Sequence, residues 1–237
     1  MGAFTVIGPD VEIGAGSWIG PHVVINGPTR IGRQNKIFQF ASIGDAPQDK
    51  KYNGEPTRLE IGDRNVFRES VTVNRGTAQD RGLTSIGDDN LFMAYSHVAH
   101  DCQVGSHCVL ANLATLGGHV ELGDWVIMGG LSAVHQHCRV GMHAFVANNA
   151  AVTRDVPPYV MAVGQPAEPH SVNSTGLSRR GFTPEQVRNI KQAFRTLYRA
   201  DLKLSDALAR LRESAALQPE VQQLVEFISL STRSLAR

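Results

Sequence analysis

Apolar residues recur at every sixth position along most of the first 152 residues of the chain. Two polar interruptions divide the pattern into runs, and no position is missed within a run. Twenty-two hexads follow it, at Ile7, Ile13, Ile19, Ile25, Ile31, Ile37, Ile43, Ile61, Phe67, Val73, Ile86, Phe92, Val98, Val104, Leu110, Leu116, Leu122, Met128, Val134, Val140, Val146 and Val152. A helix with 3.6 residues per turn would scatter these positions around its surface, so the period predicts short strands joined by tight corners.

Small side chains mark the predicted corners. They lie four residues after an apolar position, at Ser96, Cys102, Cys108, Ala114, Ser132, Cys138, Ala144 and Ala150. Three strands with their corners close a triangular turn of three hexads, and such turns stack at about the 4.8 Å spacing of paired strands. The pattern therefore predicts a parallel β-solenoid in which each hexad points one apolar side chain inward.

The interruptions, at about 45–59 and 76–84, are polar and rich in Pro and Gly. They predict two loops that leave the solenoid, and inserted loops often shape the binding face of such folds.

The six-residue pattern stops after Val152, at "DVPPYV". Thr183, Pro184 and Gln186 then provide an N-cap, a proline at the first helical position and the second half of a capping box. Two further amphipathic segments follow, near 205–216 and 219–230. The predicted organisation is a β-helix over 1–156, a linking segment over 157–182 and a helical subdomain over 183–237.

Composition narrows the class of protein. A net charge of +1 gives no reason to expect binding to nucleic acid. No apolar run approaches the roughly 18 residues of a membrane span, and the first residues do not resemble a signal peptide. Three cysteines are too few for a disulfide scaffold. We expect a cytoplasmic protein with no transmembrane segment.

Several histidines should converge on one edge of the solenoid. With 18 residues per turn, His100, Gly118 and Gln136 form one column, and His119 and His137 form the adjacent column. His97 and His135 lie beside these columns. A polar surface ladder would explain such a cluster, and so would a metal site with several imidazoles about 2.0–2.1 Å from one ion.

General-base catalysis is the third explanation, and we favour it. A histidine with a pKa near 6.5 can remove a proton from a hydroxyl at neutral pH. Asp101 could orient the ring of His100, and the bare N–H of Gly118 could face a developing oxyanion. The cysteines occupy inward positions, so we expect no thiol nucleophile. Gly118 beside His119 and Gln136 beside His135 favour a substrate cleft over a metal site, so we expect no bound metal.

Longer motifs carry a specific resemblance. They are "SHVAHDCQVG", "LGGHVELGDW", "SAVHQHCRVGMHA", "DVPPYV", "STGLSRRGF", "QDKKYNGEPTRLEIGDRN" and "VNRGT". Together they resemble the UDP-N-acetylglucosamine O-acyltransferases of lipid A biosynthesis, a hexapeptide-repeat family, along essentially the whole chain. The resemblance implies a left-handed β-helix and a homotrimer with active sites between subunits. It also implies transfer of a 3-hydroxyacyl chain from acyl carrier protein to the glucosamine 3-hydroxyl of UDP-N-acetylglucosamine, with no cofactor.

The resemblance also implies roles for individual residues. His100 matches the catalytic base of the family, Asp101 the acid beside it, and Gly118 the backbone donor to the thioester oxygen. The matches to substrate-binding positions are Asp49, Lys51, His97, His119, His135, Gln136, Asn173, Arg179 and Arg180. The last three match the region that holds the nucleotide, and arginine suits a diphosphate chemically.

Three features depart from the family pattern. The family usually starts about one and a half turns earlier, so we expect either a shortened start or a poorly capped first turn. Thr175 stands where a glutamate near the nucleotide is common, which puts that contact in doubt. Asn148 stands where a glycine leaves room for a long acyl tail, so we expect a donor shorter than fourteen carbons.

The helical tail carries local positive charge. Nine Lys or Arg and three Asp or Glu lie between Gly176 and Arg212. Arg188, Lys191, Arg195 and Arg199 follow helical spacing and form one stripe. A solvated face is the common explanation for such a stripe, but acyl carrier proteins are acidic, so it could also steer the carrier.

Rival functions remain at this point. The N-acyltransferase that acts later in the same pathway carries an extra N-terminal domain, for which this chain has no room. A metal-dependent carbonic anhydrase is built on the same type of solenoid. A non-catalytic scaffold would not need the histidine cluster.

Overall fold

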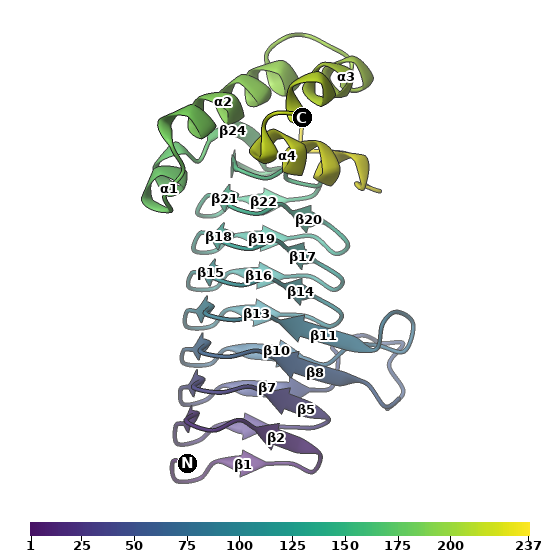
Figure 1. The fold of residues 1–237 in the computed structure, drawn as a ribbon. Coiled ribbons are helices and arrows are strands. Elements are labelled where there is room, and N and C mark those ends of the chain that lie inside the picture. The colour runs from purple at the N-terminus through teal and green to yellow at the C-terminus, as the bar shows by residue number, and fades with distance from the viewer.

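The structure is a computed structural model that describes all residues, 1–237. Three sheets of short strands form a β-helix, and the chain climbs it as a left-handed coil (Figure 1). The first sheet contains β1 (Val6–Ile7), β4 (Val24–Ile25), β7 (Ser42–Asp45), β10 (Thr72–Asn74), β13 (His97–Val98), β16 (Thr115–Leu116), β19 (Ala133–Val134) and β22 (Ala151–Val152). The second contains β2 (Val11–Ile13), β5 (Thr29–Ile31), β8 (Arg58–Ile61), β11 (Leu83–Ile86), β14 (Gln103–Val104), β17 (Glu121–Leu122) and β20 (Arg139–Val140). The third contains β3 (Trp18–Ile19), β6 (Lys36–Ile37), β9 (Val66–Phe67), β12 (Leu91–Phe92), β15 (Val109–Leu110), β18 (Ile127–Met128), β21 (Phe145–Val146), β23 (Val160–Val163) and β24 (Glu168–Val172).

The predicted turn of 18 residues is confirmed by the strand register. His97 of β13 pairs with Thr115 of β16, which pairs with Ala133 of β19. Three corners connect the sheets in every turn. We call the corner from the first sheet to the second the first corner, the next one the second corner, and the return to the first sheet the third corner.

The core of the β-helix consists of the apolar residues at every sixth position. All of them are buried from Ile19 onward, whereas Ile7 and Ile13 of the first turn are only partly buried. The phenyl rings of Phe67 and Phe92 stack inside it with centroids 4.7 Å apart. The small corner residues, such as Cys102, are fully buried, as their size predicts.

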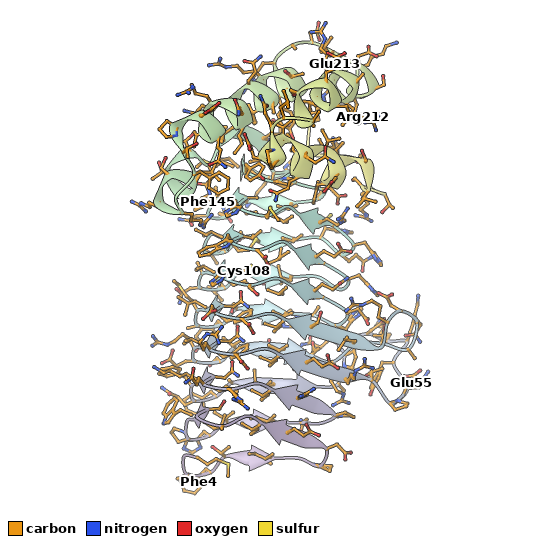
Figure 2. The ribbon with its side chains drawn as sticks, viewed as in Figure 1. Phe4, Glu55, Cys108, Phe145, Arg212 and Glu213 are labelled. Carbon is orange, nitrogen blue, oxygen red and sulfur yellow. The ribbon has the colours of Figure 1, made fainter.

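Both inserted loops leave from the first corner. The first lies between β7 and β8, and the second between β10 and β11. They protrude on one side of the β-helix in Figure 1, and Glu55 lies at the outer edge of this protrusion in Figure 2. They replace the tight corners that the neighbouring turns have at this place.

The C-terminal helices cover the end of the β-helix that lies opposite the N-terminus (Figure 1). They are α1 (Ser174–Arg179), α2 (Pro184–Tyr198), α3 (Leu204–Ala215) and α4 (Pro219–Ser229). Thr183 and Gln186 form the predicted capping box of α2, and Val187, Ile190, Phe194 and Leu197 are buried along one side of it. None of the helices combines the length and the apolar composition that a membrane span requires.

The linking segment contains more regular structure than its sequence predicts. β23 adds one more parallel strand to the third sheet, and β24 returns antiparallel to it. α1 follows directly, with Asn173 as its N-cap. The repeat did not predict these elements because β23 and β24 lack the hexad spacing.

Candidate functional site

The first corner brings the predicted histidine columns together. Three successive turns carry His100 and Asp101, then Gly118 and His119, then Gln136 and His137. The His119 N–H donates to the carbonyl of His100 at 3.0 Å, so the turns are in register. The rings of His119 and His137 stack with centroids 4.2 Å apart and planes 10° apart. The ring of His100 meets that of His119 edge-on at 5.0 Å.

A buried carboxylate holds His100. The Nδ1 of His100 lies 2.9 Å from Oδ2 of Asp101, and the Asp101 side chain has no exposed surface. Thr77 donates its backbone N–H to both carboxylate oxygens at 3.0 Å and its hydroxyl to Oδ2 at 2.7 Å. Burial alone would raise the pKa of Asp101, but the hydrogen bonds from His100 and Thr77 lower it below its ordinary value. Asp101 is therefore an ionised acceptor, and the proton on the His100 ring is at Nδ1.

Gly118 makes room for the His100 ring. A Cβ added to Gly118 would lie 2.5 Å from Cε1 and 2.6 Å from Nε2 of His100. The basic nitrogen Nε2 is thus directed over the Gly118 backbone. The Gly118 N–H donates to no acceptor within the chain, so it is free to bind an oxygen at this position.

The second loop completes this arrangement, which the sequence did not predict. Asp80 accepts a hydrogen bond from Nδ1 of His119 at 2.6 Å, and Thr84 accepts one from the backbone N–H of Asp101 at 2.8 Å. Thr77, Asp80 and Thr84 all belong to the interruption at 76–84 or its end. The departure of this loop from the same corner as the histidines was the one available signal.

The other histidines of the cluster are His97, in β13, and His135, at the first corner. His97 Nδ1 lies 2.7 Å from the Thr72 hydroxyl, and burial together with the nearby His100 lowers the pKa of His97. His135 and Gln136 are exposed, and Nδ1 of His135 lies 3.1 Å from the Gln136 carbonyl. These side chains are open to a ligand.

His100, Asp101 and His119 are the residues that could hold a metal, since their ligand atoms lie within 4.8 Å of one another. Nδ1 of His100 and Nδ1 of His119 already face Asp101 and Asp80, so a metal bound to these two atoms would replace both hydrogen bonds, whereas a metal bound to the Nε2 atoms would leave them in place. Two of the cysteines are unsuited to nucleophilic catalysis, because burial raises the pKa of Cys102 and Cys108 to about 12.

The predicted nucleotide residues lie at the second corner. Arg180 Nη1 lies 3.2 Å from Nδ1 of His143, and its guanidinium lies 5.2 Å from the centre of the Trp125 ring. The Asn173 side chain donates to the His143 carbonyl at 3.0 Å. Arg179 is exposed at the end of α1. Within one chain, the second sheet separates this group from His100.

The other predicted residues lie in the first loop and at the third corner. Asp49 accepts a hydrogen bond from the backbone N–H of Lys51 at 3.0 Å in the first loop. Asn148 is exposed at the third corner, where its Oδ1 accepts from the Gly130 N–H at 3.0 Å. A pocket of about 500 Å³ lies on the second sheet beneath α4, and none of the predicted site residues lines it.

Comparison with known proteins shows which family the chain resembles. Residues 155–236 match the family described as UDP N-acetylglucosamine O-acyltransferase, domain 2, and residues 83–118 match the bacterial transferase hexapeptide family. The UDP-N-acetylglucosamine acyltransferase of Francisella novicida has 42% identity and a TM-score of 0.98 over 100% of this chain and 87% of its own. The enzyme of Moraxella catarrhalis has 43% identity and a TM-score of 0.97 over 100% and 92%. The Arabidopsis enzyme has 29% identity and a TM-score of 0.86 over 100% and 95%.

Proposed function

The chain belongs to the family of UDP-N-acetylglucosamine O-acyltransferases, and from this premise we propose the details of its reaction. It is an acyltransferase of lipid A biosynthesis. In our proposal it catalyses the first step of that pathway, in which a 3-hydroxyacyl chain moves from acyl carrier protein to the glucosamine 3-hydroxyl of UDP-N-acetylglucosamine.

The hydrogen bond between Nδ1 of His100 and the buried carboxylate of Asp101 is the observation that carries this proposal. Because Nδ1 donates to Asp101, Nε2 has a free lone pair and can accept the proton of the 3-hydroxyl. The alkoxide attacks the thioester carbon, and the negative charge moves to the carbonyl oxygen. The Gly118 N–H stabilises this oxyanion. The intermediate then collapses, the C–S bond breaks, and the thiolate of the carrier takes the proton from His100.

The ionised state of Asp101 supports the same role for His100. A carboxylate beside the ring stabilises the imidazolium that forms after proton transfer. His97, His119, His135 and Gln136 are then positioned to bind the sugar and the acyl chain.

A homotrimer would unite the two groups of predicted residues. A column of large apolar side chains is exposed along the third corner, at Phe40, Tyr95, Leu113 and Leu131. Each has a positive φ between 60° and 63°, which is costly for a bulky residue. Exposed apolar columns of this kind mark interfaces. We infer that the third corner points towards the axis of the trimer.

This orientation determines what each cleft between subunits contains. If the third corner is central, the first sheet of one subunit faces the third sheet of the next. The outer ends of these two sheets are the first corner of one subunit and the second corner of the other. His100 and Arg180 would therefore line the same cleft although they are apart within a chain. Asp49, Lys51, Asn173 and Arg179 would join them there.

The cationic stripe on α2 supports carrier binding. Arg188, Lys191, Arg195 and Arg199 are all exposed, and none of them forms an ion pair. A shallow pocket of about 270 Å³ lies beside it, lined in part by His170, Lys191 and Arg195. Such a surface attracts an acidic partner over a distance that salt shortens.

A single product experiment tests this function. The purified protein is incubated with UDP-N-acetylglucosamine and a mixture of 3-hydroxyacyl carrier proteins, and the products are identified by mass spectrometry with fragmentation. We expect an ester on the 3-oxygen, and we expect His100→Ala to abolish it while circular dichroism and Tm stay unchanged. If UDP-N-acetylglucosamine gives no ester while a UDP-glucosamine acceptor with a free amine gives an amide, the result would indicate the N-acyltransferase reaction. Activity lost on treatment with a chelator would indicate a metal enzyme.

A further inference from the structure

The last residues of the chain return to the first corner, although the function proposed above uses none of them. Leu235 forms a bridge with Asp155, and Leu235 and Ala236 are buried. Asp155 is fully buried and accepts hydrogen bonds from the Arg139 N–H and the Ser231 hydroxyl. The tail is therefore fastened over the turn that carries His135, Gln136 and His137.

This fastening puts Arg233 over the histidine cluster. Its Nη1 lies 3.4 Å from Nδ1 of His135 and 3.6 Å from Sγ of Cys138. The residue is partly buried, and it forms no ion pair with any carboxylate of the chain. The carboxylate of Asp155, which anchors the tail, already accepts from Arg139 and Ser231.

The surroundings of Arg233 are unusual for a structural arginine. A guanidinium has five N–H donors, and here its only contacts are long ones to a ring nitrogen and a thiol. The nearest titratable neighbours are the His135 imidazole and the Cys138 thiol, and a protonated His135 would repel the guanidinium. Burial, His119 and Arg233 lower the pKa of His137, while Asp80 opposes this effect in part. A partly buried guanidinium that forms no ion pair with a carboxylate is suited to binding an anion.

We propose that Arg233 binds a phosphate group of a substrate in the cleft above His100. The inference rests on the function proposed above, because it assigns a residue to the same site. The turn beneath Arg233 lies two turns from His100, or about 10 Å at the spacing of paired strands. A hexose that bears a diphosphate can span this distance, and the extended phosphopantetheine arm of the carrier is longer. The acceptor diphosphate is thus the favoured source, and the phosphate of the arm is the other.

The test compares Arg233→Gln and Arg233→Lys with the wild-type protein. Arg210→Gln is the matched control, since it removes the same charge from an exposed position on α3, outside the first corner. Calorimetry measures the Kd for UDP, and initial rates measure KM for UDP-N-acetylglucosamine. Rates are also measured with 3-hydroxyacyl phosphopantetheine and with 3-hydroxyacyl pantetheine, which lacks the phosphate.

We expect Arg233→Gln to raise the Kd for UDP and the KM for the acceptor about ten-fold to a hundred-fold, as loss of a charge-assisted hydrogen bond does. Arg233→Lys should retain part of the affinity, and Arg210→Gln all of it. A raised KM for the phosphopantetheine donor alone, with the pantetheine donor unaffected, also supports phosphate binding and assigns it to the carrier arm.

Two results would overturn the inference. One is that every Kd and KM is unchanged in Arg233→Gln. The other is that the effect of Arg233→Gln comes only from lost stability. In that case Arg233→Gln lowers Tm, whereas Arg233→Lys has the Tm of wild type. Arg233→Lys then also has the wild-type Kd for UDP and the wild-type ratio of rates with the two donors, even in the presence of competing salt. If the wild-type protein itself makes no acylated product, the proposed function fails, whereas the comparison of UDP binding still tests Arg233.

Discussion

The imidazole of His100 lies directly over Gly118, so closely that a Cβ at position 118 would come within 2.6 Å of Nε2. The φ angle of Gly118 is not in the left-handed region, so alanine could adopt this backbone conformation. The glycine is needed for space, and the space is occupied by the residue that we propose as the base.

Gly118→Ala should therefore displace the His100 ring without unfolding the protein. We expect kcat to fall at least about a hundred-fold, since a shift of about 1 Å in a reacting group has an effect of this size. Steady-state kinetics and Tm measure the two effects. Gly130→Ala is the control, because its Cβ would meet nothing closer than 3.5 Å. Equal kcat values in wild type and Gly118→Ala would contradict the assignment.

Two inactive variants should complement each other if the site lies between subunits. His100→Ala lacks the base of the first corner, and Arg180→Glu lacks the cation of the second corner. Each mixed site draws its two corners from different chains, so roughly a quarter of the sites should be intact after refolding of an equal mixture. Activity is measured at a low concentration of the nucleotide. A mixture that is no more active than its components would exclude a shared site.

Position 148 should limit the length of the acyl chain. Asn148 is exposed at the third corner, and its side chain bonds back to the Gly130 N–H. We expect the wild-type protein to prefer a donor shorter than fourteen carbons and Asn148→Gly to accept longer donors. Competition among carrier thioesters of different lengths measures this preference. A preference of the wild-type protein for hydroxymyristoyl donors would reject the role.

The stripe on α2 should affect carrier binding but not chemistry. Reversal of Arg188 and Lys191 to glutamate should raise KM for the carrier at least several-fold at low salt and leave kcat nearly unchanged, because steering acts on encounter. Reversal of Arg210 and Arg212 on α3 changes the net charge equally and serves as the control. An unchanged KM at low salt would argue for a merely solvated face.

His143 should make stability depend on pH below neutrality. Burial and the nearby Arg180 lower the pKa of His143 to about 4, below its unfolded value of about 6.5. The unfolded chain therefore binds a proton that the folded chain excludes, and stability is lost as pH falls from 6.5 towards 4. We expect a loss of about 1–3 kcal/mol from this residue. Urea unfolding at pH 7 and pH 4.5 should show a smaller loss in His143→Gln than in wild type. His170→Gln, at an exposed position, should behave as wild type does.

The six-residue period determined the fold because the inward position of each hexad is a local property. From Ile19 to Val152 every predicted inward residue is buried, and the capping box at Thr183 begins α2 as predicted. The same period aligned His100 with Gly118, since stacking at a constant turn length converts spacing in sequence into neighbourhood in space.

Only the tertiary structure decided which groups act on these histidines. Thr77 reaches Asp101 from 24 residues away, and Asp80 reaches His119 from 39. Arg233 reaches His135 from 98 residues away. The loops and the tail have no period, so nothing in their sequence specifies where their side chains meet the β-helix. These contacts depend on how the loops and the tail pack against the completed β-helix. The burial of each hexad, by contrast, depends only on the turns directly above and below it.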